Sequence, residues 1–183
     1  MKVFLDFEAS SLSERSYPIE VGWVFQDGRT ESHLIAPAPT WDDWDNAAEV
    51  IHRISREMLV DQGEPHDVVA NRMVEALSGH DLFASAPSWD GKWLSTLLRS
   101  AGLPRHALRL RDTDEALRET ASDILRAAVP PARLDVEVHN LVARASAGKD
   151  SPPAHRALAD ATGEYAIWLR VRDAARALLN EAG

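Results

Sequence analysis

Three short apolar segments follow one another within the first 36 residues, and they restrict the fold more than any other feature of the chain. Residues 2–7, 18–25 and 29–36 are rich in the β-branched and aromatic residues that favour strands. Between the last two segments lies Asp27-Gly28, a dipeptide typical of tight hairpin turns. The sequence therefore predicts three antiparallel strands in this part of the chain.

After these strands the pattern alternates between strand and helix and then becomes helical. We expect a loop at 36–45, strands at 81–86 and 108–110, a linker at 147–153, and helices at 46–54, 65–77, 89–101, 115–128, 132–145 and 154–180. Asp114 is the expected cap of the helix at 115–128. Strands first and helices last predict an α/β fold, a mixed sheet flanked by α-helices, and the length fits a single domain over 1–183.

Composition excludes several kinds of site. The chain has no cysteine, which excludes disulfides and thiolate chemistry, so a bound metal would need carboxylate or imidazole ligands. The net charge of −9 excludes a generally basic surface for nucleic acid. Asp6 interrupts the apolar start, and no apolar run is long enough to cross a membrane. We therefore expect a cytoplasmic protein with no signal peptide and no membrane partner.

Two acidic residues interrupt the first predicted strand. Asp6 and Glu8 are two positions apart, so their side chains share one face of the strand. A solvated strand end would explain such a pair, but the apolar neighbours indicate burial, which is costly for a carboxylate unless a cation binds. Asp90, at the start of the helix after the strand at 81–86, is a further candidate. Its alternative role is that of an ordinary acid stabilised at a helix N-terminus.

A histidine and an aspartate mark the start of the last predicted helix. His155 follows a Ser-Pro-Pro sequence, so we expect it in the entry loop or the first turn, whereas Asp160 lies on the helix. The small residues Ala157 and Ala161 would let this helix approach a strand closely, which would bring Asp160 to the acidic face of the first strand. Taken singly, both polar residues would more often be solvated surface groups.

In combination these residues resemble a known set of motifs. Asp6-Phe7-Glu8, Asp90 and His155-x-Ala-x-x-Asp160-Ala are similar to the three motifs of the DEDDh family of 3′-to-5′ exonucleases, which have a ribonuclease-H-like fold. Leu12 matches an apolar residue of the family's first motif, and the segment around His52 resembles a family segment near the substrate. The resemblance extends from Phe4 to about Trp168.

The resemblance implies a metal-dependent exonuclease that releases nucleoside 5′-monophosphates from 3′ ends of single-stranded DNA or RNA. Two divalent ions, Mg²⁺ or Mn²⁺, would be held by four carboxylates: Asp6, Glu8, Asp90 and Asp160. Asp90 would act largely through water. His155 would be the general base for the attacking water, and Leu12 and His52 would contact substrate. The family precedent of dimers allows a homodimer.

The motifs also depart from the family's usual pattern. Ser10 and Ser11 stand where Thr and Gly are usual, and Arg53 replaces a common Gly. Ser85 and Ala86 stand where the second motif usually has His and Asn. A second hypothesis is therefore a degenerate member that holds a nucleic-acid end without cutting it, and a third is an acidic interaction module whose motif matches are accidental. None of the three explains three acids of the loop at 36–45: Asp42, Asp43 and Asp45.

Overall fold

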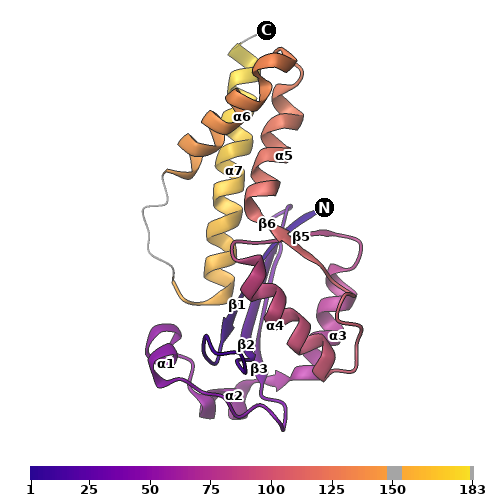
Figure 1. Ribbon diagram of the computed structural model, residues 1–183, viewed down its shortest axis with the longest axis vertical. Coiled ribbons are helices and arrows are strands. Elements are labelled where there is room, and N and C mark those ends of the chain that lie inside the picture. Colours follow the sequence, from indigo (N-terminus) through magenta and orange to yellow (C-terminus); the bar gives the residue numbers. More distant parts are fainter. Residues whose placement is uncertain (148–153, 182–183) are drawn as a thin grey trace.

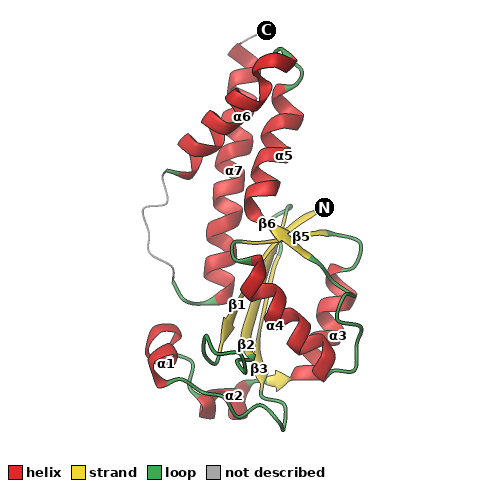
Figure 2. Cartoon of the chain, in the orientation of Figure 1, coloured by secondary structure: helices red, strands yellow, loops and turns green. Residues whose placement is uncertain are grey.

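A computed structural model describes residues 1–147 and 154–181 of the chain. The described residues form one six-stranded mixed sheet and seven α-helices (Figure 1; Figure 2). This confirms the α/β fold with helices flanking a sheet. The predicted linker at 147–153 lies outside the described residues except for Ala147, which caps the preceding helix.

The strands are β1 (Lys2–Ala9), β2 (Pro18–Phe25), β3 (Thr30–Ala36), β4 (Glu64–Pro65), β5 (Asp81–Ala84) and β6 (Leu110–Asp112). Their order in the sheet is β4-β3-β2-β1-β5-β6. The first three strands pair antiparallel as predicted, and Gly28, in the turn between β2 and β3, has a φ of 89° that glycine adopts without strain. β5 and β6 add in parallel beside β1, which makes β1 a central strand.

The helices are α1 (Asn46–His52), α2 (Arg56–Gln62), α3 (His66–Leu77), α4 (Pro87–Ser100), α5 (Thr113–Leu125), α6 (Pro131–Ser146) and α7 (Ala157–Glu181). Neither α2 nor β4 follows from the sequence pattern. α2 buries a single residue, Leu59, so it has no apolar periodicity, and β4 is two exposed residues long.

Three helix starts differ from the prediction by two or more residues: α4 begins at Pro87 rather than at 89, and the starts of α5 and α7 shift in opposite directions. α5 begins two residues earlier, because the Asp112 carboxylate accepts a hydrogen bond from the Asp114 backbone N–H at 2.9 Å and is therefore the cap. The strand predicted at 108–110 correspondingly lies at Leu110–Asp112. α7 begins at Ala157 rather than at 154, which leaves His155 in the entry loop.

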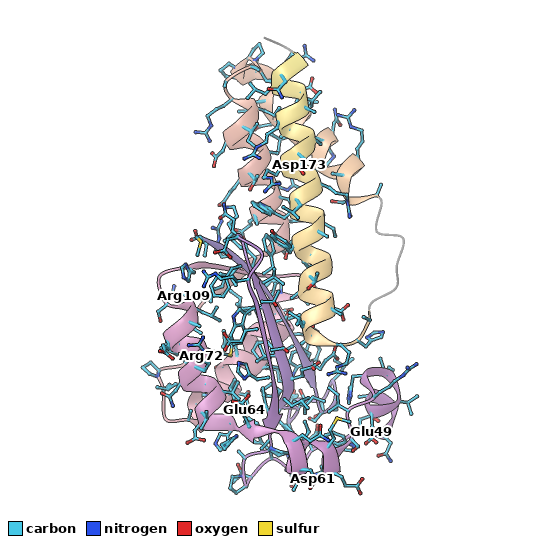
Figure 3. All side chains as sticks on the ribbon, turned by 180° about the vertical axis from the view of Figure 1, so that it is seen from behind. Glu49, Asp61, Glu64, Arg72, Arg109 and Asp173 are labelled. Carbon is cyan, nitrogen blue, oxygen red and sulfur yellow. The ribbon has the colours of Figure 1, made fainter. Side chains whose placement is uncertain are left out.

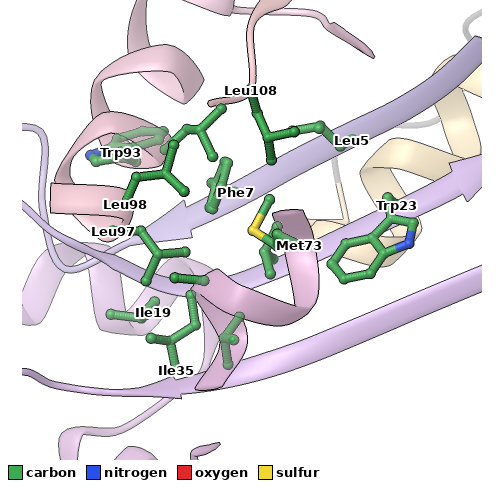
Figure 4. Close-up of a cluster of buried hydrophobic side chains, with 14 of the residues drawn as sticks. Leu5, Phe7, Ile19, Trp23, Ile35, Met73, Trp93, Leu97, Leu98 and Leu108 are labelled. Carbon is green, nitrogen blue, oxygen red and sulfur yellow. The ribbon is translucent and has the colours of Figure 1, made fainter. Parts of the chain in front are cut away.

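The alternation of side chains along β1 decides what each face of the sheet carries. One face contributes Val3, Leu5 and Phe7 to a core shared with α3 and α4, where Met73 and Trp93 are also buried (Figure 4). The other face faces α5 and α7. There Phe4 is fully buried, and the next two positions on the same face are Asp6 and Glu8.

Helix α7 crosses this second face and packs with α5 and α6 in a bundle that extends beyond the sheet (Figure 1). Trp168 anchors it, with its ring 5.8 Å from that of Phe4 and its indole N–H donating to the Thr120 hydroxyl at 2.8 Å. Within the described ranges, no helix combines the length and the apolar character needed to cross a membrane.

Candidate active site

Acidic residues of β1 and α7 meet where the helix crosses the end of the strand. Asp160, Glu164 and Trp168 are spaced four apart on α7, so they lie on one side of the helix. Trp168 packs on Phe4, and the earlier turns of the helix therefore face Asp6 and Glu8. Side-chain ligand atoms of Glu8, Asp160 and His155 all lie within 4.8 Å of one another. The predicted approach of α7 to the acidic strand is thus present.

His155 has an unusual backbone conformation. Its φ is 53°, in the left-handed region that non-glycine residues seldom occupy. Just before it, the Ala154 backbone N–H donates to Asp160 Oδ1 at 2.9 Å, which folds the entry loop back onto the first turn of α7. The loop conformation therefore brings the imidazole beside Glu8 and Asp160 rather than along the helix.

Asp90 lies in the first turn of α4 and is almost completely buried. Its Oδ1 accepts a hydrogen bond from the Phe7 backbone N–H at 3.3 Å, so the side chain reaches β1 between Asp6 and Glu8. Its Oδ2 is equally buried and has no hydrogen-bond partner among the described residues. A solvated helix acid would need neither feature, so the tertiary contact, and not only the helix dipole, holds this carboxylate.

Burial raises the pKa values of three of these carboxylates, and neighbouring charges add to the shift at two of them. Burial, followed by the charges of Asp90 and Glu8, raises the pKa of Asp6 from 3.8 to about 9. Burial and then Asp160 raise the pKa of Glu8 to about 7, and burial raises that of Asp90 to about 7. Glu164 also contributes to the shift at Asp6. Such a cluster is a site at which a divalent cation would replace protons.

An ion pair between a buried carboxylate and a half-exposed guanidinium holds the start of α7 beside the cluster, and it was not predicted from the sequence. Glu20 on β2 lies directly across from Glu8, and it accepts two charge-assisted bonds from Arg156 at 2.6 and 3.0 Å. The same carboxylate accepts the Ala157 backbone N–H at 2.9 Å. The available signal was Glu20 itself, a single acid in an otherwise apolar strand. Arg156 gave none, because solvated arginines are common.

Gly22 determines how closely the helix can approach the sheet. It pairs with Asp6 across the β1–β2 ladder, and a Cβ placed on it would lie 2.4 Å from the backbone nitrogen of Leu158. A glycine inside an apolar strand indicates such a close backbone approach. The absence of a side chain at position 22 therefore allows Asp160 to reach the acidic end of β1.

Replacing Gly22 by alanine is expected to lower both stability and activity, because the methyl group would push α7 away from the strand. Overpacking of this kind costs about 1–3 kcal/mol, which corresponds to a fall of roughly 5 °C in the melting temperature. Gly163→Ala on α7 is the matched control, since a Cβ there meets nothing within 4 Å. Equal melting temperatures for the two variants in a thermal melt would contradict this account of the packing.

The two predicted substrate contacts lie in different environments. Leu12 is exposed over 72% of its surface and lines a shallow hollow of about 390 Å³ with Trp89 and Lys92. His52 is buried at the end of α1, where its Nδ1 accepts the Ile54 backbone N–H at 3.1 Å. Its Nε2 has no hydrogen-bond partner in the described part of the chain. Leu12 is therefore accessible to a ligand, whereas His52 has at most one ring nitrogen, Nε2, that could bond a substrate.

Comparison with solved structures identifies the fold. Escherichia coli exonuclease I bound to single-stranded DNA, in its zinc form, is 16% identical, with a TM-score of 0.66 over 98% of this chain and 42% of that one. Exonuclease I from Methylocaldum szegediense is 19% identical, with a TM-score of 0.68 over the same shares. No protein-family model matches the chain, and no curated protein matches its sequence.

The chain spans less than half of these exonuclease I chains, so the similarity concerns one part of them. At this level of identity it establishes the fold. It agrees with the fold that the resemblance to the DEDDh exonucleases implied. The chain therefore has the α/β fold found in exonuclease I, with its acidic cluster at the end of the central strand.

Proposed function

We propose that this protein is a metal-dependent 3′-to-5′ exonuclease acting on single-stranded DNA or RNA. The observation that carries the proposal is the convergence of four carboxylates and one histidine, from three separate segments, at the end of β1 in an exonuclease I fold. Solved exonuclease I structures contain a dT13 oligonucleotide in one case and a product in another. Those ligands support a nucleic-acid substrate for the present chain.

The acidic cluster fits divalent metal ions. Asp90 Oδ2 is a buried acceptor without a partner among the described residues. Burial raises the pKa values of Asp6, Glu8 and Asp90, and neighbouring carboxylates add to the shift at Asp6 and Glu8. Oxygen ligands of this kind suit Mg²⁺ or Mn²⁺. Asp6, Glu8, Asp90 and Asp160 would hold two ions, which would supply charge stabilisation for the phosphodiester as it is cleaved.

His155 would accept a proton from the attacking water. Its imidazole lies beside Glu8 and Asp160, at the open side of the cluster, where the entry loop of α7 leaves it partly exposed. The water oxygen would form a bond to phosphorus while the bond from phosphorus to the 3′-oxygen of the preceding nucleotide breaks, which releases a nucleoside 5′-monophosphate. Protonation of the leaving 3′-oxygen, which becomes the new 3′-hydroxyl of the shortened strand, completes the hydrolysis.

Single strands suit the surface around the cluster. Leu12 and Trp89 present exposed apolar surface in one hollow, Trp89 directly precedes Asp90 on α4, and unpaired bases can pack on such side chains. The net charge of −9 provides little general attraction for a long duplex, so we infer a preference for short or frayed ends. His52 Nε2 would bond a polar group of the terminal nucleotide if α1 shifts to expose it.

The test is incubation of the pure protein with strands labelled at the 5′ end, as matched DNA and RNA oligonucleotides, in Mg²⁺, Mn²⁺ or EDTA. We expect a ladder shortened from the 3′ end in either metal and none in EDTA. Strand binding without cleavage would favour the degenerate end-binding alternative that Ser85 and Ala86 suggest. Neither binding nor cleavage would contradict both proposals.

A further inference from the structure

The loop between β1 and β2 includes residues 10–16, which are mostly polar; residues 12–15 are exposed, but the serines at both ends of this stretch are buried. The Ser10, Ser11 and Ser16 side chains are at most 6% exposed. Buried hydroxyl groups are destabilising unless they find hydrogen-bond partners. The partners of this loop come from two segments that are distant in sequence, the loop after β3 and helix α4.

One carboxylate of the loop after β3 accepts hydrogen bonds from the hydroxyls of Ser10, Ser11 and the exposed Ser13. Asp43 Oδ2 accepts hydrogen bonds from Ser11 Oγ at 2.5 Å and from Ser10 Oγ at 3.2 Å, and Asp43 Oδ1 accepts one from Ser13 Oγ at 2.9 Å. An ionised carboxylate is the side chain that can accept so many donors at once, because it has about four acceptor positions and no hydrogen. The two serines that replace the usual Thr and Gly of the first motif, Ser10 and Ser11, thus both bond Asp43.

Each of the three hydroxyls also fixes a backbone amide. Ser10 Oγ accepts the Tyr17 N–H at 3.1 Å, Ser11 Oγ accepts the Ser13 N–H at 2.9 Å, and Ser13 Oγ accepts the Arg15 N–H at 3.1 Å. Asp43 therefore orients hydroxyls that in turn determine the backbone path of the whole loop. Removing the carboxylate would release several bonds together.

Helix α4 holds the opposite side of the same loop. The Lys92 ammonium donates to the Ser13 carbonyl and, at 2.9 Å, to Ser16 Oγ. Ser16 Oγ also accepts the Trp93 indole N–H at 3.0 Å. The loop is thus held between α4 and the segment that carries Asp43.

The segment with Asp43 is itself anchored. Trp41 stacks on Tyr17 with ring centroids 5.0 Å apart, and the Asp45 backbone N–H donates to the Ser10 carbonyl at 3.0 Å. The Trp44 indole N–H donates at 2.8 Å to Glu49, which lies on α1 at the lower end of the molecule (Figure 3). This segment is therefore a fixed support for the loop.

The side chain that this arrangement presents is Leu12. It lies between Ser11 and Ser13, whose hydroxyls both bond Asp43. Leu12 contributes nothing to the core, because most of its surface is exposed. It lines the hollow with Trp89 and Lys92, and Trp89 directly precedes Asp90 of the acidic cluster on α4. We propose that Asp43 is a positioning residue, which acts by holding the loop so that Leu12 stands at the rim of the active site.

This inference rests on the proposed function, since Leu12 would there contact the terminal nucleotide. A loop held in place in advance lowers the ordering cost of binding that nucleotide. The effect of Asp43 should consequently appear with substrates that have bases and disappear with substrates that have none. A purely structural role would affect both kinds equally.

The first experiment compares Asp43→Asn with Asp42→Asn. The second variant is the matched control, because the exposed Asp42 carboxylate pairs with the exposed Arg15 side chain, and such pairs contribute little. Asp43→Asn should lower kcat/KM on a single-stranded oligonucleotide about tenfold. Hydrolysis of bis(p-nitrophenyl) phosphate, which has no base, should stay within about twofold of wild type. Equal losses on both substrates would overturn the inference.

The second experiment is a double-mutant cycle with Leu12→Ala. If Asp43 acts through Leu12, Asp43→Asn should cause no further loss on the oligonucleotide in the Leu12→Ala background. Additive losses would contradict the inference. Ser13→Ala, which removes one of the three donors, should give a smaller loss of the same kind, and it provides a test if Asp43→Asn folds poorly.

Amide hydrogen exchange of the free protein gives a readout that needs no activity. In Asp43→Asn the amides of Ser13, Arg15 and Tyr17 should exchange faster, while those of α5 and α7 stay unchanged. Unchanged exchange at the three loop amides would overturn the inference even if activity fell. An inactive wild type would refute the proposed function, and the inference with it. If the wild type is active and Asp43→Asn has the same kcat/KM on the oligonucleotide, the inference alone is refuted.

Discussion

Asp6→Asn is expected to abolish nuclease activity and, in the same protein, to stabilise the metal-free fold as pH rises. The loss of activity follows from removing a carboxylate that would hold metal, and several kcal/mol of transition-state stabilisation correspond to about a 10³-fold fall in kcat. The gain in stability follows from burial and from the neighbouring charges of Asp90 and Glu8, which raise the pKa of Asp6 to about 9. Asparagine has nearly the same shape and carries no charge.

The direction in which stability changes with pH follows from proton linkage. Between the ordinary pKa of 3.8 and about 9, the folded protein keeps a proton on Asp6 that the unfolded chain has already released. Folding therefore takes up a proton, and its free energy becomes less favourable as pH rises through this window. Asp6→Asn removes that dependence, so the stability difference between variant and wild type should widen up to about pH 9.

The measurement is urea unfolding in EDTA at pH 6, 7, 8 and 9, repeated with Mn²⁺. Asp81→Asn, the same change at an exposed position on β5, is the control and should show no such trend. Mn²⁺ should stabilise wild type and reverse or reduce the advantage of Asp6→Asn, because only wild type has the full ligand set. A stability difference that stays constant with pH would contradict the raised pKa and the crowded cluster behind it.

His155→Ala is expected to lower kcat on single-stranded oligonucleotides by about 10²- to 10⁴-fold, the usual contribution of a general base. Metal affinity, measured by calorimetry with Mn²⁺, should change only a few-fold. The measurement discriminates between two roles, because the imidazole lies within 4.8 Å of ligand atoms of Glu8 and Asp160 and could contribute to either. A large loss of Mn²⁺ affinity would make His155 a ligand instead of the base.

His139→Ala on the exposed surface of α6 is the matched control and should leave both quantities unchanged. Exogenous imidazole offers a second check, since a small base that enters the space left by the side chain should restore part of the lost kcat. Restored turnover with unchanged Mn²⁺ affinity would support the base. Unchanged kcat at saturating Mn²⁺ in His155→Ala would remove it from that role.

Local signals in the sequence were sufficient for most elements of the fold. The three N-terminal strands were predictable because apolar residues and the Asp27-Gly28 turn determine them locally. α2 and β4 were not, because α2 has only Leu59 in the core and β4 is two residues long. Such elements depend on their neighbours for stability, and a sequence pattern contains no trace of that support.

The candidate site shows the same division. Asp6, Glu8, Asp90, His155 and Asp160 were identifiable as a motif set, and the structure brings carboxylates of three segments together. The pairing of Glu20 with Arg156 was not identifiable, because an ion pair between residues 136 positions apart appears only when β2 and the start of α7 are packed together. Asp43 likewise looked like a surface acid until its partners on the β1–β2 loop were known.

The amino-acid sequence by itself determined which chemistry the protein can hold: oxygen and imidazole ligands, no thiolates, and acids placed on one face of a strand by its two-residue period. Only the tertiary structure decided how that chemistry is arranged. The close approach at Gly22, the bond from Phe7 to Asp90 and the contacts of Asp43 all join segments far apart in the chain. The physical reason is that local periodicity selects the face a side chain occupies, whereas distances between segments depend on packing of the whole core.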